Sequence, residues 1–314
     1  MLRSYLRVSD LTPRDLALLL DLAADYKSSR ARRGLLEGES VVLYFNKPST
    51  RTRISFETAI ARLGGAPITV GPNDLQMGRG ETIEDTARVI SRYARAYVTR
   101  TFADADVRRF AAAASIPVVN ALTDGHHPCQ ALADLLTVRE HLGGLEGKTL
   151  TYVGAGNNVA HSLMEACALA GMHVRVAVPA KYPVDAEVIE RSTAMARATG
   201  ATVTVLDDVR AGVHGADVVY TDTWLSMGDP PEERETRLRD LWPYRVDDAL
   251  MALAAPGARF MHCLPAHRGE EVTDEVADSR ASVIFDQAEN KLHTAIAVLD
   301  ALLERKLEGS GLAP

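Results

Sequence analysis

Two arginines and three hydroxyl residues begin a predicted helix, in the run Ser49-Thr50-Arg51-Thr52-Arg53. The apolar run before them is typical of a buried strand, and apolar residues at helical spacing follow up to a Gly-Gly pair. A helix start carries partial positive charge, so arginines there are unfavourable unless an anion joins them. Free N–H groups, hydroxyls and guanidinium groups together suit a phosphate. The alternative is a solvated first turn whose arginines pair with nearby carboxylates.

Other polar residues also follow predicted strands. In the first half of the chain, Arg100 ends one strand, and His127 and Gln130 begin the helix after the next. In open α/β sheets, ligands bind beyond the carboxyl ends of the strands. Arginines, hydroxyls, a histidine and a glutamine at these ends suit a phosphate and a carbonyl group.

The second half places a different set of residues at its strand ends. They are Asn157, Asn158, Asp222, Ser226, Met227, Cys263 and Leu264. Amides, an acid and a hydroxyl suit the ammonium and carboxylate groups of an amino acid.

Three other kinds of chemistry are less well supported. The run Gly-Ala-Gly-Asn-Asn resembles a dinucleotide loop, but Val159 stands where the third glycine is needed, and the next strand ends without a ribose-binding acid. No obvious base lies next to Cys263 to make it a covalent nucleophile. Several histidines and cysteines could suggest a metal, yet no pair has zinc-ribbon or zincin spacing. These residues are His126, His127, Cys129, His262 and Cys263.

Alternating short apolar strands and helical patterns position these residues. This alternation predicts an α/β fold with two doubly wound parallel-sheet domains joined by helices. We expect domains at 1–140 and 141–290, and the C-terminal helix, 291–314, could pack back on the first domain. Thr12, Pro13 and Asp15 predict the capped start of a helix near the N-terminus. The expected strands are residues 41–45, 67–70, 96–100, 116–120, 150–154, 173–179, 202–206, 216–222, 259–265 and 282–286.

Composition limits the classes of function. The 314 residues carry a net charge of −7, which argues against a general binder of nucleic acid or anionic membranes. Hydrophobic residues make up 46% and charged residues 25%, as in ordinary soluble proteins. Three widely spaced cysteines are too few for a disulfide framework. With no signal segment or membrane-spanning run evident, we expect a cytoplasmic protein.

Four separated motifs carry a resemblance to a known family: STRTR at 49–53, HPCQ at 127–130, DTWLSMG at 222–228 and HCLP at 262–265. With them, the whole chain resembles the aspartate/ornithine carbamoyltransferase family. The Ser-Met-Gly run after an aspartate is similar to the ornithine branch of that family.

The resemblance implies transfer of a carbamoyl group from carbamoyl phosphate to L-ornithine, in arginine metabolism. It implies a homotrimer or a multiple of trimers, no metal, no organic cofactor, and no nucleic-acid or membrane partner. It further implies two sets of binding residues. Carbamoyl phosphate is assigned to Ser49, Thr50, Arg51, Thr52, Gln76 (from a neighbouring subunit), Arg100, His127, Gln130, Cys263, Leu264 and Lys291. L-ornithine is assigned to Asn158, Asp222, Ser226 and Met227, and the catalytic residues are Arg51, Arg100, His127, Asp222 and Cys263.

Two positions depart from the family pattern. Ala155 stands where an aspartate is usual, and Lys291 stands where an arginine is usual. Lys291 is either the cation that completes the phosphate site or a surface lysine. The departures motivate one alternative function, a carbamoyltransferase for another amine or diamino acid. A second alternative, against which the intact motifs argue, is a weakly active regulatory paralogue. The Gly/Pro-containing run that begins at Ser226 has the composition of a lid.

Overall fold

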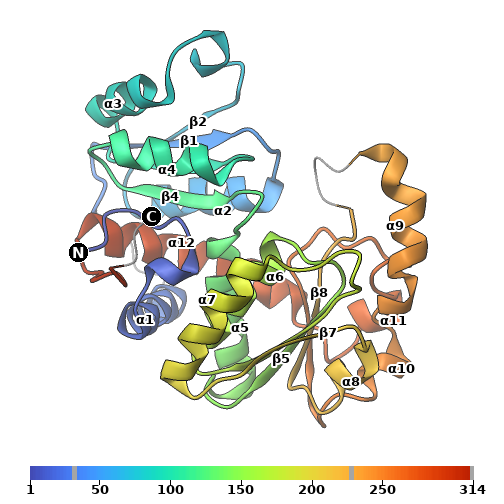
Figure 1. Cartoon of the computed structure of the whole chain (residues 1–314). Helices are drawn as coiled ribbons and strands as arrows, with labels where there is room; N and C mark the ends of the chain where they lie inside the picture. Colours follow the sequence, from blue (N-terminus) through green and yellow to red (C-terminus); the bar gives the residue numbers. More distant parts are fainter. Residues whose placement is uncertain (30–33, 226–229, 312–314) are drawn as a thin grey trace. The chain divides into compact units, whose positions relative to one another are not determined.

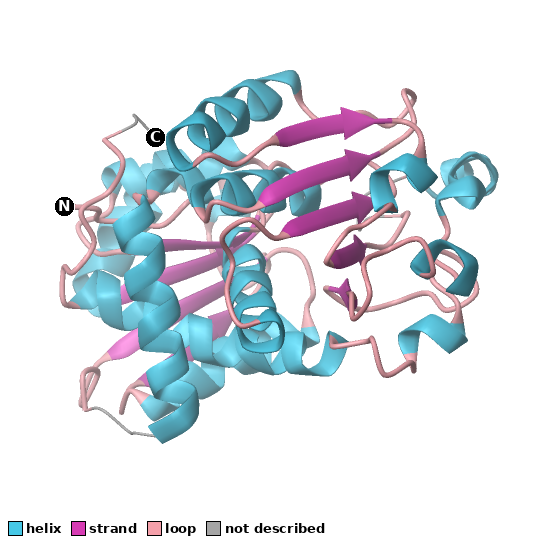
Figure 2. Cartoon of the chain, turned by 90° about the horizontal axis from the view of Figure 1, so that it is seen from below, coloured by secondary structure: helices cyan, strands magenta, loops and turns pink. Residues whose placement is uncertain are grey.

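The computed structural model describes residues 1–29, 34–225 and 230–311. The chain divides into two compact units. Unit 1 comprises Met1–Ala133 and Glu289–Pro314, and unit 2 comprises Asp134–Ala288. Each unit contains one sheet whose strands all run parallel (Figure 2). The predicted fold class, with two parallel-sheet α/β domains, is therefore confirmed.

The sheet of unit 1 has four strands. Their order is β2 (Ala66–Val70), β1 (Ser40–Phe45), β3 (Ala96–Arg100) and β4 (Val118–Leu122). Because β1 lies between β2 and β3, the strand order reverses at the β1–β3 pair, which is where ligands bind in such sheets. All residues of β3 and β4 are buried, which fits apolar strands covered on both faces.

Helices cover this sheet. α1 (Pro13–Ser29), α2 (Thr50–Arg62), α3 (Ile83–Tyr93) and α4 (Asp104–Ala113) belong to unit 1, with short 3-10 turns η1 (Val8–Asp10) and η2 (Met77–Arg79). α3 and α4 lie side by side and pack their apolar residues on the sheet (Figure 1). There the ring of Phe110 on α4 stacks on Tyr97 of β3, with centroids 3.9 Å apart.

The predicted capping pair at the start of α1 is confirmed. The Thr12 N–H donates to Asp15 Oδ2 over 2.9 Å, and the Asp15 N–H donates to Thr12 Oγ1 over 3.1 Å. Asp15 also accepts hydrogen bonds from the backbone N–H groups of Glu308 and Gly309. One carboxylate therefore fixes both the first turn of α1 and the C-terminal segment of unit 1.

The sheet of unit 2 has five strands. Their order is β7 (Val203–Leu206), β6 (His173–Ala177), β5 (Thr149–Val153), β8 (Val218–Thr221) and β9 (Arg259–His262). The order reverses at the β5–β8 pair, and this is the expected ligand position in unit 2. The remaining elements are α6 (Asn158–Leu169), α7 (Ala186–Thr199), α8 (Val209–Val213), η3 (Pro231–Glu233), α9 (Arg234–Leu241), η4 (Trp242–Tyr244), α10 (Asp248–Met251) and α11 (Asp274–Ala277).

Two helices contain the points where the chain passes from one unit to the other. These are α5 (Pro128–Leu142) and α12 (Ile284–Leu303). Among the described residues, no helix is long and apolar enough to cross a membrane.

The strand predicted at residues 282–286 is wrong. Only Ser282 makes a bridge, to Phe260, and α12 begins at Ile284. Ile284 and Gln287 are buried, whereas Phe285 is 69% exposed, and this is the spacing of a helix with one buried face. A short apolar run cannot be assigned to strand or helix by periodicity alone.

Candidate functional site

The first group of site residues lies where the strand order of unit 1 reverses. Ser49 caps α2, as predicted, because the Thr52 N–H donates to its side-chain oxygen over 3.3 Å. Thr50, Arg51 and Thr52 form the first turn of α2, which contains no acidic residue. This helix start therefore presents backbone N–H groups beside a cation, as an anion site requires.

The two arginines of this turn differ in their surroundings. Arg53 Nε donates to Glu57 Oε1 over 2.9 Å, and its side chain is 57% exposed. For Arg53, the alternative of a solvated arginine paired with a carboxylate is correct. Arg51 is half-buried. The candidate phosphate ligand of the pair is therefore Arg51.

Arg100, His127 and Lys291 gather in unit 1. Arg100 ends β3 and is 7% exposed, and His127 precedes α5 and is also buried. Burial, and then the positive charges of Lys291 and Arg100, hold the pKa of His127 well below its usual value of 6.5. His127 is therefore neutral at pH 7, beside two cations.

Lys291 is not a surface lysine. It lies on α12 with 7% exposure, and its Nζ donates to Gln130 Oε1 over 2.6 Å. Gln130 is 1% exposed. The structure therefore brings together four of the residues predicted for carbamoyl phosphate: Arg100, His127, Gln130 and Lys291.

Lys47, which was not predicted from the sequence, follows β1 and is 6% exposed. Its Nζ lies 2.5 Å from Asp124 Oδ1 and 4.3 Å from the ring centroid of Phe102. Its backbone N–H donates to the Arg100 carbonyl over 3.4 Å. Lys47 thus ties together the segments that follow β1, β3 and β4. A lysine two residues after an apolar strand was the available signal.

Gln76 belongs to a different part of unit 1. It is exposed and precedes η2, and its carbonyl accepts the N–H groups of Arg79 and Glu81. In the part of the chain that it describes, the structure does not bring Gln76 together with the group formed by Arg100, His127, Gln130 and Lys291.

The second group of residues lies at the β5–β8 reversal in unit 2, around Asp222. Asp222 follows β8 and is 6% exposed. Its Oδ1 accepts from Cys263 Sγ over 2.9 Å and from the Thr223 N–H over 2.8 Å, and its Oδ2 accepts from Asn157 Nδ2 over 2.8 Å. The structure thus brings the predicted residues Asp222 and Cys263 into contact.

Asn157 is the amide that contacts Asp222. Its Oδ1 caps α6 by accepting the N–H groups of Val159 and Ala160, both over 3.0 Å. Capping fixes the orientation of the side chain, so its NH₂ group points to Asp222. Asn158, the asparagine assigned to ornithine, is the first residue of α6 and is half-buried.

The glycine-rich run before α6 has a packing role. A Cβ at Gly156 would lie 2.2 Å from the Pro183 carbonyl oxygen, and the Gly156 N–H donates to the Tyr182 carbonyl over 2.9 Å. Only glycine permits this close approach of two backbone segments. The likeness to a dinucleotide loop therefore has a structural explanation.

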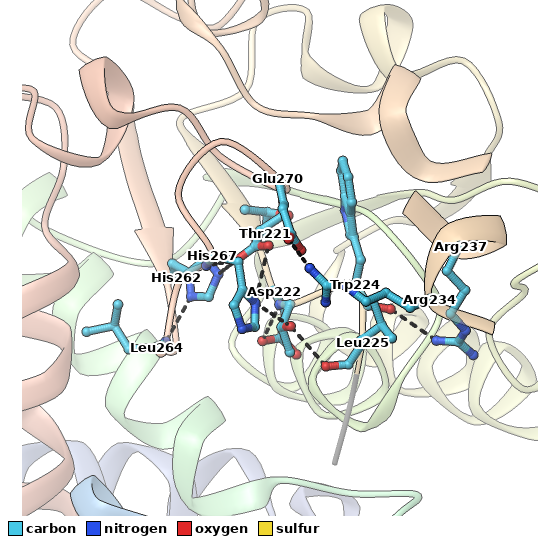
Figure 3. Close-up of polar contacts among 12 residues, drawn as sticks. Thr221, Asp222, Trp224, Leu225, Arg234, Arg237, His262, Leu264, His267 and Glu270 are labelled. Carbon is cyan, nitrogen blue, oxygen red and sulfur yellow. Dashed lines mark hydrogen bonds and ion pairs between the residues drawn. The ribbon is translucent and has the colours of Figure 1, made fainter. Parts of the chain in front are cut away.

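Asp222, His262 and Cys263 present possible metal-ligand atoms within 4.8 Å of one another. Both ring nitrogens of His262 already have partners, however: the Leu264 N–H, 2.8 Å from Nδ1, and Glu271 Oε1, 3.0 Å from Nε2. Figure 3 shows His262 directed at Leu264 beside Asp222.

Ser226 and Met227, predicted for ornithine, lie outside the described residues, as does the first part of the predicted lid. The described residues on either side of that part are in contact. Arg237 Nη1 donates to the Trp224 carbonyl over 3.1 Å, and Arg234 forms an ion pair with Glu270 (Figure 3).

Comparison with known proteins agrees with this architecture. Residues 3–140 match the carbamoyl-P binding domain of aspartate/ornithine carbamoyltransferases, and residues 146–302 match the Asp/Orn binding domain. The chain therefore belongs to the aspartate/ornithine carbamoyltransferase family, and the resemblance seen in its motifs is confirmed.

Individual relatives carry the more specific name ornithine carbamoyltransferase. The protein of that name from Acidothermus cellulolyticus is 54% identical over 305 residues, which is 97% of each chain. The one from Parafrankia sp. is 51% identical over 314 residues, or 98% of each chain. The solved structure of ornithine carbamoyltransferase from Pyrococcus furiosus gives a TM-score of 0.91 at 47% identity and covers 96% of each chain.

Proposed function

We propose that this protein transfers the carbamoyl group of carbamoyl phosphate to the δ-amine of L-ornithine, giving L-citrulline and phosphate in arginine metabolism. Full-length similarity to ornithine carbamoyltransferases supports this proposal. The observation that carries it is the Asp222 carboxylate, in contact with Cys263 and Asn157 at the strand-order reversal of unit 2. A buried carboxylate in this position suits a substrate that carries an ammonium group.

We assign carbamoyl phosphate to unit 1, through its helix start and its buried cations. The N–H groups and hydroxyls of Ser49, Thr50 and Thr52 would hold the phosphate together with Arg51. Arg100 and Lys291 would stabilise the negative charge that grows on the departing phosphate. Gln130 would be held in place by Lys291.

His127 would polarise the carbamoyl carbonyl group. A neutral imidazole offers one N–H donor, and the lowered pKa keeps the ring neutral across the physiological range. A donor that is already in place when the oxygen gains negative charge in the tetrahedral intermediate lowers the barrier.

We assign L-ornithine to unit 2. Asp222 would orient a substrate amine, with Cys263 and Asn158 beside it, and Ser226 and Met227 would complete the site. Leu264 and Cys263 would also contribute to the carbamoyl-phosphate site, as in the expectation from the motifs.

The reaction needs no redox step. The lone pair of the neutral δ-nitrogen forms a bond to the carbamoyl carbon, the bond from that carbon to the phosphate-bridging oxygen breaks, and the electron pair leaves with phosphate. The nitrogen then loses one proton to phosphate or solvent. The δ-ammonium has a reference pKa near lysine's ~10.4, so the site must favour the neutral amine by desolvation and by nearby positive charge.

We also propose a homotrimer or a multiple of trimers in the cytoplasm. Unit 1 exposes several large apolar side chains, which suit an interface between copies of the chain. They are Ile54, Ile68, Val89, Tyr93 and Phe102. In this assembly, Gln76 would reach the site of a neighbouring subunit. The three cysteines, all within the described part of the chain, are free thiols.

The proposal is tested by incubating the protein with carbamoyl phosphate labelled with ¹³C at the carbamoyl carbon and L-ornithine. We expect ¹³C-citrulline and equimolar phosphate, identified by mass spectrometry and a phosphate assay. A labelled product that forms only with a different amine would favour the first alternative, a carbamoyltransferase for that amine. Carbamoyl phosphate binding without turnover of any amine would favour the regulatory paralogue.

A further inference from the structure

His262, the last residue of β9, contacts the backbone of the segment that carries Cys263 and Leu264. Its Nδ1 accepts the Leu264 N–H over 2.8 Å (Figure 3). A backbone N–H can only donate, so Nδ1 carries no proton and the ring proton is on Nε2. The tautomer of His262 is thus tied to the conformation of the next two residues.

Glu271 accounts for this tautomer. Its Oε1 lies 3.0 Å from His262 Nε2, and both side chains are completely buried. The same oxygen accepts the His267 N–H over 2.6 Å, and the Glu271 carbonyl accepts the Val246 N–H. An ionised carboxylate can only accept hydrogen bonds, so it selects the imidazole whose Nε2 is protonated.

The segment held in this way has an unusual backbone. Leu264 has a φ of 60°, in the left-handed region that non-glycine residues adopt rarely. The Leu264 N–H bond to His262 is a contact that favours this conformation. At the other side of the same turn, Cys263 Sγ donates to Asp222 Oδ1 over 2.9 Å. A change in the turn would therefore move the thiol away from the Asp222 carboxylate.

We propose that Glu271 is a positioning residue, which acts through His262 and the Leu264 N–H to hold Cys263 against Asp222. The hydrogen bonds of the Glu271 side chain go to His262 and His267, so Glu271 acts on Cys263 indirectly. None of the four motifs includes Glu271. The consequence for ornithine rests on the proposed function, whereas the consequence for the Cys263 thiol does not.

The thiol provides the direct test, by its rate of alkylation with iodoacetamide. Burial raises the pKa of Cys129 to about 12 and also raises that of Cys167, so the half-buried Cys263 is the thiol expected to react. The reactive species is the thiolate, and a thiol that donates its proton to Asp222 is held in the unreactive form. Glu271→Met should therefore speed the alkylation of Cys263 by at least about tenfold. Peptide mass spectrometry measures the rate.

Two variants control this measurement. Glu271→Gln keeps an oxygen that can accept from His262 Nε2, so its rate should stay within about threefold of the parent. Glu165 is also completely buried and pairs with Arg191 in the same unit, so Glu165→Met measures the effect of losing a buried glutamate elsewhere. We expect Glu165→Met to lower the melting temperature without changing the rate at Cys263. Equal rates in Glu271→Met and the parent would overturn the proposal, as would equal acceleration by Glu165→Met.

A further pair of variants applies if Glu271→Met does not fold. His262→Asn keeps an oxygen that can accept the Leu264 N–H, whereas His262→Leu keeps none. We expect slow alkylation of Cys263 in His262→Asn and fast alkylation in His262→Leu. The same rate in both would contradict the assigned chain of contacts.

Kinetics separate this proposal from the proposed function. We expect Glu271→Met to lower kcat/KM for ornithine by at least about tenfold and Glu271→Gln to restore most of it. Faster alkylation in a protein that does not use ornithine would sustain the positioning role and refute the proposed substrate. Unchanged alkylation would refute the positioning role for any substrate.

Discussion

Lys291 Nζ donates a hydrogen bond to Gln130 Oε1 over 2.6 Å, which joins α12 to the first turn of α5 within unit 1. Both side chains are buried, and the charge of Lys291 also lowers the pKa of His127. Burying a cation is costly unless it meets a partner or an anion. This cost supports Lys291 as the cation that replaces the arginine usual in the family.

Replacing Lys291 by methionine should weaken the use of carbamoyl phosphate. Loss of a charged hydrogen bond typically costs ~1.5–3 kcal/mol, which is about 10- to 100-fold in kcat/KM. Lys291→Arg keeps the charge and should retain most of the activity. Because Lys291 is buried, Lys291→Met should also lower the free energy of unfolding by about 1–2 kcal/mol, measured in urea. A methionine variant within about twofold of the parent in carbamoyl phosphate kinetics would remove Lys291 from the site.

Arg51 and Arg53 offer a matched comparison on α2. Arg51→Met should lower kcat/KM for carbamoyl phosphate by about 10² to 10³, because a donor aimed at the leaving group is lost. Arg53 is exposed and paired with Glu57, so Arg53→Met should change the free energy of unfolding by at most about 0.5 kcal/mol and the kinetics only slightly. Steady-state kinetics of both variants check that the loss of kcat/KM is much larger in Arg51→Met than in Arg53→Met. Similar losses in the two variants would mean that the phosphate is not bound as proposed.

His127 should make the protein less stable in acid. In the unfolded chain its pKa is 6.5, and in the folded protein it is well below that value. Below pH 6.5 the unfolded state therefore binds a proton that the folded state does not. The free energy of unfolding consequently decreases as the pH is lowered. Between pH 7.5 and 5.5 this costs at most about 1.4 kcal/mol, the limit for a folded His127 that stays neutral throughout. Urea unfolding at both pH values measures the loss in the free energy of unfolding. This loss should be smaller in His127→Gln than in the parent, by up to this amount. An identical pH dependence in the two proteins would show that folded His127 titrates normally.

The strand that ends at Phe45 and the helix start at Ser49 could be predicted from the sequence because their signals are local. An apolar run followed by a hydroxyl and a second periodic run defines a strand, a cap and a helix without reference to the rest of the chain. Asn158 shows the limit of such reasoning. Two adjacent asparagines look alike in sequence, and only the capping geometry shows that Asn157 contacts Asp222.

The residues that the sequence did not reveal are buried lysine and glutamate side chains. Lys47 contacts Asp124, which lies 77 residues further along the chain, and Glu271 contacts His262 with both side chains buried. Lysine and glutamate are usually exposed, so residue type alone does not predict their burial, although the position of Lys47 after an apolar strand was a signal. The same reason explains the wrong strand at 282–286, where the packing of Ile284 and Gln287 decided the conformation.

The central claim is that this protein carbamoylates L-ornithine, and the most direct measurement is kcat/KM for a panel of amines at fixed carbamoyl phosphate. Putrescine lacks the carboxylate and N-acetylornithine lacks the α-ammonium, so each would leave polar groups of the site unpaired. We predict that both are poorer than ornithine by at least about 10²-fold. Turnover of either compound at a rate equal to or above that of ornithine would contradict the account.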